Sequence, residues 1–330
     1  MIERPPIAPD SPSRSHGSGR RPRPPARLAL AIALAVAGCG TSPPAPSASD
    51  LPSPSPSGDP APGPPDGLLV STGGGIGIID ASGVLAAFDE PAARVTAVSA
   101  GSGSVVALDA AGRVLLSADP GGAARSWTTV ELPAVQSPTA RSIALSPAGT
   151  TLAIVDGELQ GRMFELIVLD PGSGARRSHL VERGLDGPPR WLGNGRVAVN
   201  AISNHQRSGM AVLDVGTGEL VAEGLAGYSI AATADGRTVA FDDAATGETL
   251  VGAASEWLAA RLEGMARIPG DGRPAIAGLA LNAAGTRLAV LRSGDTDSTI
   301  ELFHLRDLRW DAVQVVTMPG NQAITMAWLR

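Results

Sequence analysis

Cys39 is the residue of this sequence with the clearest chemical potential, because it is the single thiol among 330 residues. A lone cysteine rules out an intramolecular disulfide. It follows Leu28 to Ala37, an apolar run of ten residues that is too short to span a bilayer, since a spanning helix needs about 20. Before this run stands a basic segment with Arg20, Arg21, Arg23 and Arg27. A basic segment followed by a short apolar run predicts an export signal over residues 1–38.

The segment Leu34 to Cys39 reads LAVAGC and resembles a bacterial lipobox. The resemblance implies that a signal peptidase cleaves between Gly38 and Cys39 and that the thiol of Cys39 carries a diacylglyceryl group with palmitate-type chains. The mature protein would then be a lipoprotein on the outer face of the cytoplasmic membrane. The alternative interpretations are a plain signal peptide or a chance cysteine.

Three parts of the chain follow from composition. Residues 1–38 are the predicted signal peptide. Residues 39–66 are the lipidated cysteine and a disordered tether rich in Pro, Ser and Ala. Twenty-seven residues of extended chain reach at most ~80 Å at ~3.1 Å per residue. Residues 67–330 are the predicted folded domain.

The remaining chemistry-bearing residues do not form a recognisable catalytic or metal site. Three histidines occur in the mature chain, none within metal-ligand spacing of another: His179, His205 and His304. Asp295 and Asp297 resemble part of a calcium loop but lack its other ligands. Asp242 and Asp243 are better interpreted as the polar end of a strand than as a carboxylate pair. We predict no catalytic residue, no metal and no cofactor.

A hairpin unit recurs along the chain and indicates the architecture. Ile143 to Val155 reads IALSPAGTTLAIV, two short apolar runs around a turn with Pro147 and Gly149. Copies stand at Ala97–Asp109, Arg190–Val199, Ile230–Asp242 and Leu279–Leu291. The turn positions 102, 149, 195, 236 and 285 are 41 to 49 residues apart. A period in the forties built from strands and turns is typical of propeller blades.

The two ends of the domain complete one further blade. Ile324 to Arg330 matches the innermost strand of the unit, with Trp328 falling on Trp191, and stops before its turn. Pro65 to Val70 supplies the missing turn and second strand. We therefore predict an all-β, six-bladed β-propeller in which one blade is shared between the N- and C-terminal strands.

Two finer predictions follow from the repeat. Turns that join the third to the fourth strand of a blade are expected at Gly83, Gly112, Gly174 and Gly218. Ser255 to Glu263 is predicted as a fourth strand, although its residues would also suit a helix with Ser255 as N-cap.

The SPxG-type turn followed by LAIV or VAFD resembles the WD40-like, PD40-type repeats of TolB-type propellers. The resemblance covers residues 67–330 as degenerate repeats. In this respect the chain is similar to lipid-anchored actinobacterial proteins that contain such propellers. It implies a propeller fold with a role in binding or assembly at the cell envelope.

The net charge of the mature chain narrows the classes of molecule that it could bind. Residues 39–330 hold 20 arginines against 30 acidic residues, a net charge of −10, which argues against nucleic acid. Three polar segments, Asp156–Arg162, Ile202–Gly209 and Ser293–Ser298, are expected on one face of the ring. The residues expected to form a binding surface there are Glu158, Asn204, His205, Arg207 and Asp295. The alternative is that these segments are merely solvated loops.

We therefore predict a non-enzymatic, monomeric binding or scaffolding module, held at the membrane by its N-terminal lipid and bound to another envelope protein or a small ligand. The alternative function is a metal-assisted propeller hydrolase or lactonase. Such enzymes need several carboxylate, Asn or His ligands on the propeller axis, where this sequence supplies mostly Ala, Leu, Thr and Ser.

Overall fold

The computed structural model describes residues 67–72, 75–80, 84–87, 95–117, 126–132, 142–157, 164–181, 184–203, 206–243, 245–270, 275–306, 309–319 and 323–329. Residues 1–66, with the predicted signal peptide, Cys39 and tether, lie outside the described residues. None of the helices in the described stretches is both long enough and apolar enough to cross a membrane.

The described strands form six antiparallel sheets of four strands, here called blades 1 to 6. Blade 1 contains β24 (Ala323–Trp328), β1 (Leu68–Thr72), β2 (Gly75–Ile79) and β3 (Leu85–Ala87). Blade 2 contains β4 (Val95–Gly101), β5 (Ser104–Asp109), β6 (Val114–Ser117) and β7 (Thr128–Val130). Blade 3 contains β8 (Ser142–Leu145), β9 (Leu152–Gly157), β10 (Phe164–Leu169) and β11 (Arg176–Val181).

Blades 4 to 6 follow the same order. Blade 4 contains β12 (Gly184–Leu192), β13 (Arg196–Ser203), β14 (Gln206–Asp214) and β15 (Leu220–Leu225). Blade 5 contains β16 (Ile230–Ala232), β17 (Thr238–Asp243), β18 (Glu248–Ala253) and β19 (Ala266–Ile268). Blade 6 contains β20 (Ile276–Leu281), β21 (Arg287–Ser293), β22 (Asp297–Arg306) and β23 (Arg309–Pro319). In each blade the four strands are called a to d in this order.

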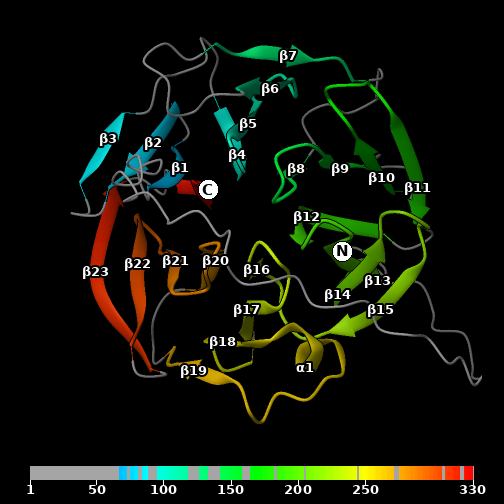
Figure 1. Cartoon of the computed structure of the whole chain (residues 1–330). Coiled ribbons are helices and arrows are strands. Elements are labelled where there is room, and N and C mark those ends of the chain that lie inside the picture. Colours follow the sequence, from blue (N-terminus) through cyan, green and yellow to red (C-terminus); the bar gives the residue numbers. More distant parts are fainter. Residues whose placement is uncertain are drawn as a thin grey trace, which may run out of the picture. The chain divides into compact units, whose positions relative to one another are not determined.

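The a strands form a closed inner ring. Each contacts the next, from β24 to β4, β8, β12, β16, β20 and back to β24. Figure 1 shows the blades arranged around this ring, with the d strands at the periphery. Six antiparallel sheets around a central channel are a six-bladed β-propeller, so the predicted fold is confirmed.

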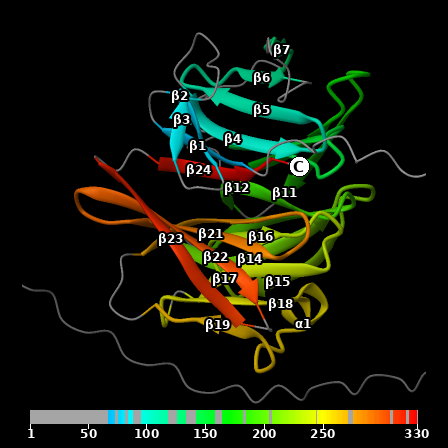
Figure 2. The same cartoon turned by 60° about the vertical axis from the view of Figure 1, so that its left-hand side comes forward.

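Blade 1 is shared between the two ends of the domain, as predicted. Strand β24 pairs with β1 through Leu68 opposite Trp328 and Val70 opposite Met326. The N–H of Leu329 donates to the carbonyl of Gly67 at 2.9 Å. Figure 2 shows the red strand β24 beside the blue strand β1. Pairing strands from opposite ends of the domain closes the ring.

The core lies between the blades rather than within them. Each of its six clusters of buried residues comes from two neighbouring blades, and Val, Leu, Ile and Ala dominate. Strands expose side chains to both faces in alternation, so a sheet packed on both sides buries most of its residues. Trp191 and Trp328 occupy equivalent places on their a strands. Their Nε1–H groups donate to Ala144 and Ala280 of the preceding blades at 3.1 and 3.0 Å.

Three of the turns between strands a and b are built alike. A glycine with φ near +70° to +77° donates its N–H to the carbonyl of the first turn residue: Gly149 to Ser146, Gly236 to Thr233 and Gly285 to Asn282. Only glycine adopts this conformation without strain. In blades 2 and 4 the predicted turn positions 102 and 195 also lie in the a–b turns, although the left-handed glycine of each turn is a different residue. The left-handed glycines there are Gly103 and Gly193, because these two turns are shorter.

The predictions for the turns between strands c and d were partly wrong. Gly174 and Gly218 do lie there, between β10 and β11 and between β14 and β15. Gly112 instead lies between β5 and β6, the b and c strands of blade 2. A turn that begins with Asp has the same local chemistry at either place. The pattern therefore predicts that a turn is present, but not which two strands of the blade it joins. Gly83 lies outside the described residues.

The strand predicted over Ser255 to Glu263 was also wrong. Helix α1 (Ala254–Leu258) begins there, with Ala253 rather than Ser255 as its N-cap, and the d strand is β19 farther along. The indole of Trp257 is fully buried, lies 6.0 Å from the ring of Phe241 and donates its Nε1–H to Ala226 at 3.0 Å. Burial of this side chain favours the short helix over the repeat pattern.

Candidate functional site

The predicted binding loops all join strands b and c, in blades 3, 4 and 6. The topology therefore places them on one face of the ring, as expected. Of the five predicted site residues, Glu158, Asn204 and His205 lie outside the described residues. Arg207 lies on β14 opposite Ile202, and its side chain is not among those described. Asp295 is exposed between β21 and β22.

The carboxylates of Asp242 and Asp243 each accept hydrogen bonds from backbone N–H groups. The Oδ1 atom of Asp242 accepts the N–H groups of Tyr228 and Ser229, both at 2.6 Å. The Oδ1 atom of Asp243 accepts the N–H of Ala245 at 3.0 Å. Both carboxylates hold backbone in place, which agrees with their interpretation as the polar end of a strand.

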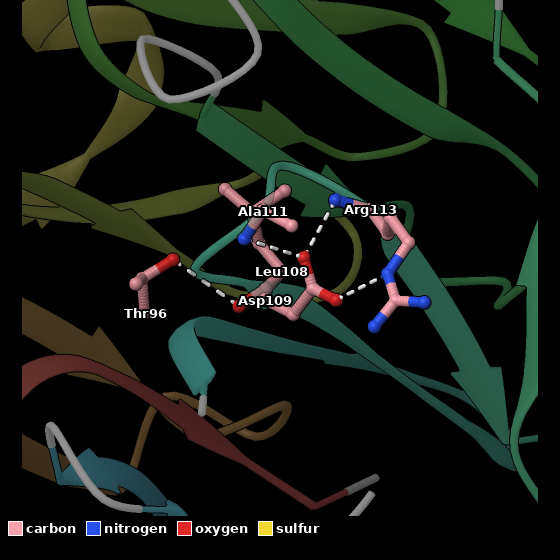
Figure 3. A network of polar contacts seen from close by, with 5 residues as sticks. All are labelled: Thr96, Leu108, Asp109, Ala111 and Arg113. Atoms are coloured by element: carbon pink, nitrogen blue, oxygen red, sulfur yellow. Dashed lines mark hydrogen bonds and ion pairs between the residues drawn. The ribbon is translucent and has the colours of Figure 1, made fainter. Parts of the chain in front are cut away.

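Other aspartates have the same role. Figure 3 shows the Oδ1 atom of buried Asp109 accepting the N–H groups of Ala111 and Arg113 at 2.9 and 2.8 Å, while Oδ2 pairs with Arg113 Nε at 2.6 Å. The Thr96 hydroxyl donates to the Leu108 carbonyl at 3.2 Å. These contacts fix the turn between β5 and β6.

Asp170 and Asp214, at the c–d turns of blades 3 and 4, are half-buried and also hold their own turns. The Ser173 hydroxyl, aided by backbone N–H groups, holds the pKa of Asp170 below its ordinary value. The backbone N–H groups of Thr217 and Gly216 lower the pKa of Asp214 in the same way. A carboxylate with a lowered pKa is a poor proton donor or acceptor at neutral pH.

Two of the three histidines in residues 39–330, His179 and His304, lie on strands β11 and β22. His179 packs against the turn at Gly218. Desolvation, with smaller contributions from Arg287 and Arg306, lowers the pKa of His304. In the described part of the chain, no group of three or more His, Cys, Asp or Glu side chains could hold a metal ion.

The central channel contains a concave site. A cavity of about 70 Å³ lies on the axis and is lined by residues from all six a strands. The lining side chains are almost entirely neutral: Ser99, Ala100, Ala144, Leu145, Pro147, Trp191, Ala231, Ala232, Leu279, Ala280, Leu281, Met326, Ala327 and Trp328. The exception is Arg190 on β12.

Arg190 is half-buried, and burial lowers the pKa of its guanidinium to about 10. The group stays cationic at neutral pH, so it gives the channel a positive charge. Sequence reasoning missed this residue. One signal in the sequence could have pointed to it: Arg190 stands directly before Trp191, at a position where the aligned units carry the apolar residues Ile143, Ile230 and Leu279.

The sequence matches no protein-family model and no curated protein with which it was compared. Among solved structures, TolB from Acinetobacter baumannii is similar with a TM-score of 0.57 at 10% sequence identity, over 79% of this chain and 65% of the TolB chain. The fold is shared. A chain of the nidogen–laminin complex is similar with a TM-score of 0.56 at 16% identity, over 80% of this chain and 98% of that one. This chain thus spans just under two thirds of the TolB chain, and at such identities the likeness concerns the fold alone.

Proposed function

We propose that this protein is a lipid-anchored, extracytoplasmic β-propeller that binds or scaffolds another component of the cell envelope. The observation that carries the proposal is the closed ring, which presents the b–c connections of six blades on one rigid face. Binding residues commonly sit on loops that a rigid scaffold positions. The aspartates Asp109, Asp170 and Asp214 hold turns, and the lowered pKa values of Asp170 and Asp214 make these two poor acid–base groups at neutral pH.

The likeness to known propellers supports a protein partner. One similar chain belongs to a complex of two proteins, nidogen and laminin. The positive charge of Arg190 in the channel counts against a resident metal cation there, and with it against a metal-assisted hydrolase. We therefore propose a monomeric binding module without enzymatic activity.

The proposed anchor rests on Cys39 and the LAVAGC segment. The lipid would place the domain on the outer face of the cytoplasmic membrane, at the end of the tether. The test is the mass of the mature N-terminus in membrane fractions. Cys39→Ala should abolish lipidation and leave an uncleaved precursor, whereas Ser47→Ala in the tether should be processed like the wild type. A wild-type protein without a lipid at its N-terminus would refute the anchor.

The proposed binding face is tested by site-specific photo-crosslinking in intact cells. A crosslinker at exposed Asp295, between strands b and c, should give a discrete product with a partner. A crosslinker at exposed Thr150, in an a–b turn on the opposite face, is the matched control and should give none. Equal products at both positions, or none at either, would contradict a partner bound on the b–c face.

A further inference from the structure

The central channel combines a small cavity with one unpaired cation. Its volume of about 70 Å³ has room for roughly five waters, or for one small polyatomic ion. Arg190 reaches this cavity from β12, the a strand of blade 4. Within the described residues, its guanidinium makes one hydrogen bond, from Nη1 to the carbonyl of Pro189 at 3.3 Å, and no ion pair. Most of its five N–H donors are therefore available to a ligand.

Burying a cation without a counterion is unfavourable, and the lowered pKa of Arg190 reports the same desolvation. The other lining side chains cannot relieve it, because none of those described carries a negative charge. Ser99 adds a second donor to the wall. Its oxygen accepts the N–H of Leu145 at 3.0 Å, so its own O–H can donate elsewhere.

We propose that the channel binds a small oxyanion, a phosphate or carboxylate group, with the guanidinium of Arg190 as its principal contact. The planar fork of an arginine matches both groups through two parallel N–H···O bonds. The neutral walls and the low local dielectric strengthen that interaction. The proposal does not depend on the lipid anchor or on an envelope partner.

The test is equilibrium dialysis of the purified protein against radiolabelled inorganic phosphate at constant ionic strength. Labelled acetate is the carboxylate arm. Arg190→Met keeps much of the aliphatic stem but removes the charge. Arg196→Met makes the same charge change at an exposed position of the same blade and is the matched control.

We expect one saturable site in the wild type for phosphate, acetate or both. Arg190→Met should weaken that binding by about tenfold or more, because charge-assisted hydrogen bonds dominate such sites. Arg196→Met should leave it unchanged. A saturable site for one anion alone identifies which oxyanion the channel takes.

Thermal melting supplies a second, independent readout. The anion should raise the melting temperature of the wild type and of Arg196→Met, but not that of Arg190→Met. In anion-free buffer Arg190→Met should melt higher than the wild type, since it removes a half-buried charge that has no counterion among the described residues. The proposal is overturned if neither anion binds saturably to the wild type, or if Arg190→Met binds as tightly as Arg196→Met.

Discussion

Removal of strand β24 by deleting residues 323–330 should unfold the propeller. The strand is the innermost member of blade 1, and its side chains pack into the core between blades 1 and 6. Thr325 also links β24 to blade 2, because its hydroxyl accepts the N–H of Val98 at 2.8 Å. Without β24 the edge of β1 loses its partner and the ring opens.

The size of the effect follows from two side chains. Met326 and Trp328 are 5% and 7% exposed. Truncating a buried methionine costs about 2–5 kcal/mol and a buried tryptophan about 3–5 kcal/mol. Their combined loss, about 5–10 kcal/mol, is comparable with the whole free energy of unfolding of a typical domain, about 5–15 kcal/mol. Trp328→Ala alone should therefore lower the free energy of unfolding by about 3–5 kcal/mol, plus about 1 kcal/mol for the hydrogen bond to Ala280.

The assay is urea unfolding of purified domain followed by circular dichroism. Trp328→Phe keeps one aromatic ring but loses the second ring of the indole and its N–H donor, so it should cost about 1–3 kcal/mol, less than Trp328→Ala. Val315→Ala, at a side chain that is 59% exposed, is the neutral control and should stay within about 0.5 kcal/mol. A truncated domain that unfolds at the wild-type urea concentration would refute the role of β24 in closing the ring.

Three further perturbations test the interior. In urea unfolding, Gly149→Ala should lower the free energy of unfolding by about 1–3 kcal/mol more than Gly247→Ala. Both glycines have φ near +70° to +77°, but a Cβ at Gly149 would meet the backbone of Ser102, whereas one at Gly247 would meet nothing. Equal losses would contradict the close packing of neighbouring turns. Glu301→Gln breaks the buried ion pair with Arg292 (Nε to Oε2, 2.9 Å) and should lower the free energy of unfolding by about 3–5 kcal/mol. Glu248→Gln breaks the more exposed pair with Arg267 and should lower it by about 0–1 kcal/mol. Similar losses in the two variants would argue against burial as the cause. The pKa of His304 is lower in the folded than in the unfolded state, so the free energy of unfolding should fall as pH drops below about 6.5. His304→Gln should reduce this pH dependence. An unchanged pH profile in the variant would show that other groups cause the dependence.

Local chemistry made the blades predictable from sequence. Glycines such as Gly149 and Gly236, set between two apolar runs, specify a tight turn whatever surrounds it. The same pattern at Trp191 and Trp328 predicted equivalent places, and both indoles donate to an alanine carbonyl of the preceding blade. Cys39 and the binding loops could be named from sequence because their residue types alone suggest chemistry. Most of those residues lie outside the described stretches, so their roles stay predictions.

Tertiary structure decided what depends on contacts between distant segments. The segment Ala254–Leu258 is helical where the repeat predicts a strand. The helix buries the indole of Trp257, which packs against Phe241 and donates to Ala226. Asp109 and Asp170 hold turns at different places in their blades, although the local pattern is alike. The channel lining was the hardest part to predict from sequence, because it is assembled from six strands whose first residues lie 42 to 47 residues apart along the chain. Alternation tells which side chains of a strand share a face, but only ring closure brings Arg190 to the axis among neutral walls, where burial makes its charge significant.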